Sequence, residues 1–224
     1  MAFFYAEMTS HPRFAEPELL WAWLAGRSVA RGLPQPVPDH GGMRVDTRSA
    51  HETCRYVFAG PGPGLRALLA ATRAPRTFVK MCGPGQELLA LAPPGWQLQP
   101  GGYLMTHAGP RHAAPALAPG YRVELDQQGV VIAARIHAGD GTLAASGYAV
   151  EHGGAFVFDR IATDAAHRRR GLGRVLMAAL AARQRSDSAR RVLVATEDGR
   201  ALYEALGWRV VSPYSTIVIP DSER

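Results

Sequence analysis

The sequence has few of the residues that mark a special compartment or a stapled fold. It holds two cysteines, Cys54 and Cys82, which form no C-x-x-C pair, so neither a disulfide framework nor a zinc site is expected. No stretch approaches the roughly 18 uninterrupted apolar residues of a membrane-spanning helix. The first residues lack the basic region and apolar run of a signal peptide. We therefore expect a cytoplasmic protein without a membrane partner.

Lysine is almost missing as well. Lys80 is the only lysine, so arginine supplies 24 of the 25 basic residues behind the net charge of +6. Genome base composition explains most of this arginine, and the charge alone names no partner. With 224 residues, 47% of them hydrophobic, the chain can bury a core as one large or two small domains.

Hydrophobic periodicity and turn residues predict a mixed α/β sheet. Residues 108–119 are rich in Ala, Pro, Gly and His and predict a linker between an α/β region at 1–115 and a second domain at 116–224. The predicted helices are 17–31, 65–73, 86–91, 171–184 and 199–206. The predicted strands are 43–46, 55–59, 77–82, 121–125, 130–136, 143–151, 155–163 and 191–196, with a closing pair of strands within 209–219.

The two regions show a weak internal similarity. Thr77–Cys82, a short helix and Gly95-Trp96 follow one another in the first region; Arg191–Thr196, a short helix and Gly207-Trp208 do so in the second. The order and spacing match, while most identities do not. Two interpretations stay open, a degenerate structural repeat and two unrelated strand–helix–strand units.

The most informative segment runs from Ile161 to Arg174. A strand ends there, a short turn follows, and an amphipathic helix begins on Gly171 and Gly173. Free backbone N–H groups and the helix dipole make such a helix start attractive to anions, and glycines let a ligand approach closely. Four arginines surround it, so we predict a pyrophosphate site rather than a solvated run of charge. These arginines are Arg168, Arg169, Arg170 and Arg174.

Other nucleotide motifs are missing or incomplete. There is no G-x-x-x-x-G-K-[ST] P-loop. The segment 62–67 matches G-x-G-x-x-A, but Pro61 and Pro63 remove two N–H donors and the next strand ends without a carboxylate for a ribose. We interpret this segment as a turn.

Two motifs together resemble the GNAT N-acetyltransferase superfamily. Arg168-x-x-Gly171-x-Gly173 is similar to its [RQ]-x-x-G-x-[GA] signature, and 201–208 is similar to its A-x-x-Y-x-x-x-G-[FW] segment. The resemblance covers about 121–219 and implies a GNAT fold there, preceded by an α/β half that is either an added module or a degenerate GNAT-like copy. It also implies acetyl-CoA as cosubstrate, with pantetheine and pyrophosphate contacts from Ile161, Thr163, Arg168, Arg169, Arg170, Gly171, Leu172, Gly173 and Arg174.

Acetyl transfer to an amine requires a neutral amine and a protonated leaving thiolate. Deprotonating an amine with a pKa near 10 at pH 7 costs about 4 kcal/mol, which a positioned base offsets. The resemblance implies that Tyr203 is the general acid. Asp159 is our candidate base, acting through water, with a structural strand-edge carboxylate as the alternative. Glu197 and Asp198 are weaker candidates for the base.

The sequence thus predicts an N-acetyltransferase that acts in a ternary complex on a primary amine of a small molecule or peptide. The alternatives are an inactive acyl-CoA-binding regulator and a nucleic-acid-binding protein, the latter disfavoured because aromatics are only 8%. No spacing predicts a metal site, and there is no G-x-S-x-G hydrolase motif. His107 and His112 are expected in solvent. An apolar closing strand could pair two subunits into a homodimer.

Overall fold

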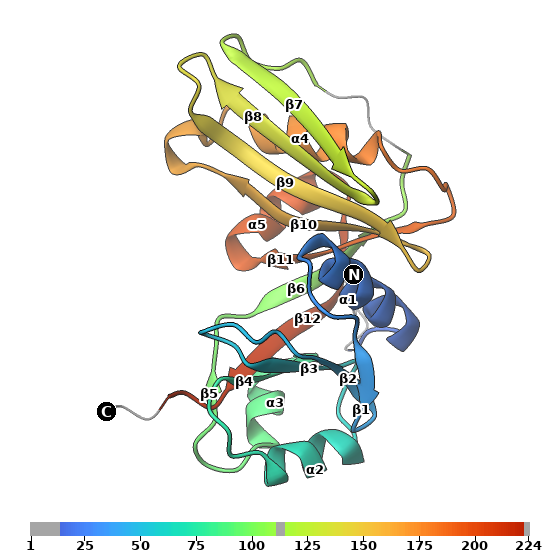
Figure 1. Cartoon of the computed structure of the whole chain (residues 1–224), viewed down its shortest axis with the longest axis vertical. Coiled ribbons are helices and arrows are strands. Elements are labelled where there is room, and N and C mark those ends of the chain that lie inside the picture. The colour runs from blue at the N-terminus through green and yellow to red at the C-terminus, as the bar shows by residue number, and fades with distance from the viewer. Residues whose placement is uncertain (1–13, 111–114, 222–224) are drawn as a thin grey trace, which may run out of the picture.

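The computed structural model describes residues 14–110 and 115–221 and joins them in one continuous sheet (Figure 1). Twelve strands in the described residues form this sheet. Its order is β1-β2-β3-β4-β12-β6-β11-β10-β9-β8-β7, and β5 pairs with β12 beside this path. The predicted mixed α/β class is confirmed, because the sheet contains both parallel and antiparallel pairs of strands and helices lie between strands along the chain.

The second half begins with an antiparallel meander, continues with two parallel strands joined by helix α4, and ends in a strand that pairs antiparallel with its neighbours. Gly129, Gly141 and Gly153 adopt positive φ in the three tight turns between its first strands. Its elements are β7 (Tyr121–Gln128), β8 (Val131–Ala138), β9 (Leu143–His152), β10 (Ala155–Thr163), a 3-10 turn (Ala165–His167), α4 (Leu172–Ala181), β11 (Arg190–Thr196), α5 (Glu197–Ala205) and β12 (Arg209–Val218).

The first half repeats a shorter version of this order. A helix connects two parallel strands, β3 and β4, as α4 connects β10 and β11. Its elements are α1 (Pro17–Ala30), β1 (Val37–Asp39), β2 (Gly42–Val45), β3 (Cys54–Phe58), α2 (Pro63–Ala71), β4 (Thr77–Cys82), α3 (Gly85–Ala90), β5 (Gln97–Leu98) and β6 (Gly102–His107).

The two halves exchange their last strands. β6, from the first half, pairs antiparallel with β11 of the second, and β12, from the second half, pairs antiparallel with β4 of the first. β6 and β12 also pair with each other at the centre of the sheet. The unit β4–α3–β6 therefore corresponds to β11–α5–β12, which supports the degenerate repeat among the two interpretations of the sequence. The division at residue 115 stays a prediction, since the sheet runs across it.

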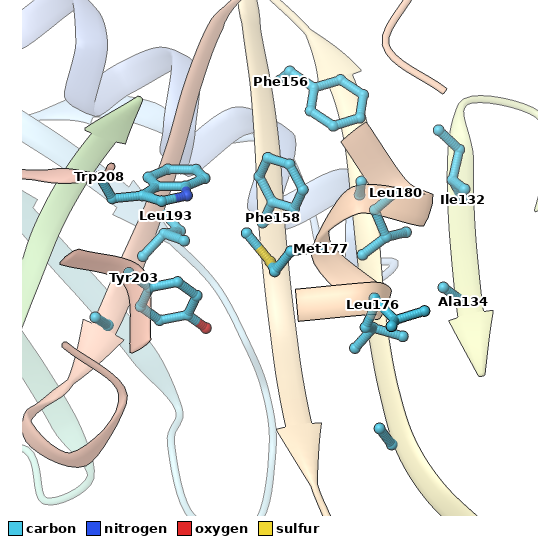
Figure 2. Packing of buried hydrophobic residues seen from close by; sticks show 14 of the residues in the cluster. Ile132, Ala134, Phe156, Phe158, Leu176, Met177, Leu180, Leu193, Tyr203 and Trp208 are labelled. Atoms are coloured by element: carbon cyan, nitrogen blue, oxygen red, sulfur yellow. The ribbon is translucent and has the colours of Figure 1, made fainter. Parts of the chain in front are cut away.

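Strand periodicity places the helices on opposite faces of the sheet. In β10, Ala155 and Val157 pack under α1, whereas Phe156 and Phe158 pack under α4. The first half shows the same alternation, with Val57 towards α1 and Phe58 towards α2. Figure 2 shows the largest cluster, in which α4 and α5 cover one face of the second half. Helix α1 covers the other face, next to β9 and β10 (Figure 1).

Some elements differ from the sequence prediction. The closing pair of strands is a single strand, β12, interrupted by a register shift between Val210 and Ser212. β1, β5 and β6 were not predicted. β1 and β5 are three and two residues long, and β6 begins at the second glycine of Gly101-Gly102, a pair that is typical of a loop.

Candidate functional site

The site lies where two parallel strands separate. β10 and β11 pair only at their starts, from Ala155–Val157 to Arg190–Val192. Beyond these residues β11 continues against β6 and β10 continues against β9, so the two strands leave each other without a shared ladder. A gap in the sheet results, and backbone and side chains of both strands face it.

A bulge in β10 sharpens this separation. The register of β10 against β9 shifts between Asp159 and Ala162, so Arg160 and Ile161 together oppose Gly147. Arg160 has a positive φ of 52°, which is rare for a residue other than glycine. A Cβ on Gly147 would lie 2.4 Å from the end of the Ile161 side chain, so a larger residue opposite the bulge would force this side chain to move. The bulge therefore takes backbone groups of Ile161 out of the ladder beside the gap.

A cavity of about 280 Å³ fills the space between the strands. Phe158 to Ile161 of β10 and Leu193 to Thr196 of β11 form its sides. Tyr203 of α5 reaches it from one face of the sheet, and Arg27 of α1 from the other. Groups from both faces of the sheet thus reach the cavity, so an acetyl donor and an amine acceptor could meet there from opposite sides.

The loop after β10 has the geometry of an anion site. The Asp164 carboxylate accepts a hydrogen bond from the N–H of Ala166 at 2.9 Å and caps the 3-10 turn. Arg169 and Gly171 follow with φ of 65° and 76°, and Gly171 is the N-cap of α4. Within the described residues, no hydrogen bond uses the backbone N–H groups of 169–173. Consecutive free donors at the start of a ten-residue helix are what a phosphate group binds.

The loop arginines differ in their surroundings. Arg170 donates to the Tyr121 hydroxyl at 2.8 Å, and Tyr121 also contacts Nδ1 of His167 at 2.9 Å, which orders this side of the loop. Arg168, Arg169 and Arg174 are exposed and form no ion pair with any residue the structure describes. Three uncompensated cations therefore lie next to the free N–H groups, in agreement with an anionic ligand.

The remaining predicted cofactor residues are positioned by packing. Leu172 is buried in the core under α4, which fixes the start of the helix. A Cβ on Gly173 would lie 3.0 Å from the Leu202 side chain and 3.9 Å from the Thr163 hydroxyl, so the helix start, α5 and the end of β10 meet closely at this residue. The structure thus brings the predicted loop residues together, with Ile161 and Thr163 at the end of β10.

Tyr203 lies between the core and the cavity. Its ring packs edge-on against Trp208 with centroids 6.1 Å apart, and its hydroxyl points away from the indole (Figure 2). Burial raises the pKa of Tyr203 to about 12. The phenol is therefore protonated throughout the neutral range and can donate a hydrogen bond.

Asp159 lies on the opposite side of the cavity and is held by arginines. Arg31, the C-cap residue of α1, donates to both carboxylate oxygens, at 2.7 and 2.9 Å. Arg27 lies 3.8 Å away and Arg160 3.4 Å away. This arrangement occupies the lone pairs that a general base would use. The assignment of Asp159 as base stays a prediction, and the geometry gives it a second role, that of anchoring α1 over the gap.

The weaker candidates for the base, Glu197 and Asp198, are not among the residues that line the cavity. Glu197 accepts a hydrogen bond from the Tyr103 hydroxyl at 2.5 Å at the rim of β6, and Asp198 lies exposed in the first turn of α5. The Thr196 side chain caps this helix by accepting from the N–H of Gly199 at 3.2 Å. This segment therefore forms the entry to helix α5.

Sequence reasoning missed the residues that form the α1 side of the cavity. Arg27, Arg31, Lys80 and Tyr214 line it together with Trp23, although they come from α1, β4 and β12. The one available signal was Lys80. It is the single lysine beside 24 arginines, so this position departs from the strong preference for arginine in the rest of the chain.

The expected exposure of His107 is wrong. His107 is buried, since β6 lies inside the sheet, and its ring packs at 5.6 Å from Trp208. His112 lies outside the described residues. Among the residues described, no group of three His, Cys, Asp or Glu side chains could hold a metal ion, and no helix combines the length and apolar character needed to cross a membrane.

The corresponding loop of the first half is closed. Gly62 is the N-cap of α2, and Pro63 at the first helical position removes an N–H donor. A Cβ on Gly64 would lie 1.9 Å from the carbonyl oxygen of His40, so the turn between β1 and β2 already occupies the space in front of this helix. The rejection of a nucleotide site at 62–67 agrees with this packing. The interpretation of the segment as a turn is wrong, because residues 63–67 are the first residues of α2 and follow its N-cap, Gly62.

Comparisons with known proteins agree with this fold. Residues 123–210 match the family model described as Acetyltransferase (GNAT) domain, which confirms the resemblance in the second half. No curated protein sequence matches the chain. Among solved structures, the chain is similar to a GCN5-related N-acetyltransferase from Kribbella flavida, at 14% identity and a TM-score of 0.63, with 92% of this chain and 96% of the other covered.

Two further structures show the same fold. A protein from Novosphingobium aromaticivorans, assigned to the GNAT family, has 17% identity and a TM-score of 0.55, with 93% of this chain and 100% of the other covered. A tandem GNAT protein from the clavulanic acid biosynthesis pathway has 14% identity and a TM-score of 0.50, with 66% and 65% covered. Similarity at this level establishes the fold, including a relative built of two GNAT units.

Proposed function

From a GNAT domain at residues 123–210, we propose that this protein transfers an acetyl group from acetyl-CoA to a primary amine of a small molecule or peptide. The observation that carries the proposal is the gap between β10 and β11, which lies beside the loop with free N–H groups. Such an arrangement lets a thioester enter from the α4 and α5 face while an amine enters from the α1 face.

The residues suggest how each partner would be held. The N–H groups of 169–173 and the exposed arginines would bind the pyrophosphate of acetyl-CoA, and the backbone of Ile161 and Thr163 would bind its pantetheine arm. The amine nitrogen attacks the thioester carbonyl carbon, the C–S bond breaks, and the CoA thiolate leaves. Tyr203 would donate a hydrogen bond to that sulfur, and the proton lost by the amine passes to water or to Asp159.

Calorimetry with CoA, followed by an acetyl-transfer screen over primary amines, tests the proposal. We expect one CoA per chain, because the corresponding loop of the first half is closed by His40. Each charge-assisted hydrogen bond contributes about 1.5–3 kcal/mol, so the double variant Arg169→Ala/Arg174→Ala should bind CoA at least about tenfold more weakly. The exposed Arg66 of α2 offers a matched control, Arg66→Ala. Absence of CoA binding to the wild-type protein would reject the proposal.

A second candidate is a regulator that binds acyl-CoA without turnover. The observation that favours it is the bidentate contact of Arg31 with Asp159, which leaves the cavity without a free carboxylate base among the described residues. The same screen separates the two functions. CoA binding together with thiol release and an acetylated product supports the enzyme, whereas CoA binding without release for any amine supports the regulator.

A further inference from the structure

The α1 side of the cavity carries an excess of positive charge. Four cationic side chains line it, against one carboxylate, that of Asp159. Both oxygens of Asp159 accept hydrogen bonds from Arg31, so this carboxylate balances mainly the charge of Arg31. The other three cations are Arg27, Lys80 and Arg160.

Arg27 and Lys80 are the cations least compensated by the protein. The guanidinium of Arg27 is 3.8 Å from Asp159 and only 16% exposed. Lys80 donates to the Thr216 hydroxyl at 3.2 Å, a neutral partner that uses one of its three donors. Glu52, the other carboxylate that acts on both cations, is itself bonded by Arg55. The pKa of Lys80 is lowered to about 8, chiefly by burial, as expected for an ammonium without a full counter-charge.

Tyr214 provides an independent sign of a missing ligand. It is 6% exposed, lines the same cavity, and packs edge-on against Trp23 with centroids 5.3 Å apart. Its buried hydroxyl has no hydrogen-bond partner among the described residues. Buried polar groups are nearly always paired, so an unpaired hydroxyl in a cavity that Arg27 and Lys80 also line favours a ligand oxygen there. Burial raises the pKa of Tyr214, which keeps the phenol a donor.

We propose that the acceptor is a primary amine that also carries an anionic group, a carboxylate or a phosphate, bound by Arg27, Lys80 and Tyr214. This inference rests on the proposed function and specifies its substrate class. The anion would complete the charge balance of the α1 side and accept the hydrogen bond of Tyr214. The cations on the α1 side of the cavity also disfavour the ammonium form of the acceptor amine. They therefore help to supply the neutral amine that attacks the thioester.

Matched acceptor pairs test this proposal on the full chain. The pairs are glycine and glycinamide, β-alanine and β-alaninamide, and O-phosphoethanolamine and ethanolamine. Binding of each is measured by calorimetry in the presence of saturating CoA, which requires no turnover. We expect the anionic member of at least one pair to bind about tenfold or more tightly than its partner, from one charge-assisted hydrogen bond. The carboxylate and phosphate arms identify which anion is preferred.

Two conservative variants connect the preference to the residues. Lys80→Met keeps the length of the side chain, and Tyr214→Phe keeps the ring against Trp23. Each variant should reduce the preference for the member with the anionic group about tenfold, while the affinity for the member without this group and the affinity for CoA stay the same. Arg66→Met, on the exposed face of α2, serves as the control. Unfolding temperatures of all variants establish that they are folded.

The outcomes distinguish this inference from the proposed function. The anionic acceptor would be overturned if every member without the anionic group binds equally well or more tightly, if no member with the group binds, or if the variants lose equal affinity for both. Thiol release only with amines that lack an anionic group would also overturn it, while the proposed function would stand. Anionic preference without acetylation of any amine would support the anionic site and reject the enzyme.

Discussion

Replacing Tyr203 by phenylalanine isolates the contribution of one hydroxyl to acetyl transfer. The ring of Tyr203 packs against Trp208 in the buried cluster under α4 and α5, and phenylalanine retains this contact. No described residue forms a hydrogen bond with the hydroxyl, so its removal leaves no protein group unpaired. We therefore expect the stability of Tyr203→Phe to lie within about 0.5 kcal/mol of the wild type, and CoA affinity to be unchanged.

The pKa sets the size of the kinetic effect. A phenol with a pKa of about 12 is a much weaker acid than a thiol with a pKa of about 8.5, so complete proton transfer to the thiolate is uphill by about 5 kcal/mol. Tyr203 should thus act by hydrogen bonding to the developing thiolate, worth about 1.5–3 kcal/mol for a charged acceptor. The expected fall in kcat is about 10- to 150-fold.

The assay is steady-state thiol release between pH 6 and 10, with an amine chosen from the screen. Because the pKa of Tyr203 is about 12, the wild type should show no loss of kcat in this range from ionisation of the phenol. An unchanged kcat in Tyr203→Phe would refute a role at the sulfur. A fall of more than about a thousandfold, with a basic limb below pH 10 that the variant lacks, would show that proton donation rather than hydrogen bonding is used.

Three further predictions concern the cavity and the closed loop. Asp159→Asn should lose about 2–3 kcal/mol of unfolding free energy, measured in urea, because Arg31 loses its charged partner; a loss below about 0.5 kcal/mol would contradict the anchoring role. Gly64→Ala should lower stability by about 1–3 kcal/mol through the clash with the His40 carbonyl, yet leave CoA affinity intact in calorimetry. Burial lowers the pKa of Lys80 from 10.5 to about 8, so the unfolded chain binds more protons than the folded one between these pH values, and wild-type stability rises with pH in this range. Urea unfolding at pH 7 and pH 10 should show this rise for the wild type and not for Lys80→Met. An equal pH dependence of stability in the two proteins would refute the prediction.

The donor side of the site could be predicted from sequence because it is local. The free N–H groups, Gly171 and the arginines lie within one loop and one helix turn, so a short motif contains nearly all of their geometry. Leu172 fits the same pattern, since its burial follows from the amphipathic period of α4.

The acceptor side could not be predicted in the same way. Arg31 meets Asp159 across 128 positions, and Lys80 meets Thr216 across 136. Periodicity within α1 identifies a buried face but not what lies under it, and nothing local shows that β4 and β12 become neighbours. His107 was misjudged for the same reason, because its burial depends on β6 entering a sheet formed by the other half.

The exchange of β6 and β12 has a consequence for how the chain acquires its structure. β11 lacks one neighbour until β6 is in place, and β4 lacks one until β12, which follows the other strands in the sequence, has emerged from the ribosome. Neither half can complete its hydrogen-bond ladder by itself, and contacts between residues far apart in sequence form slowly. We expect a fragment cut near residue 115 to expose two unpaired strand edges and to aggregate. Truncated or engineered versions of the protein should therefore keep both halves together.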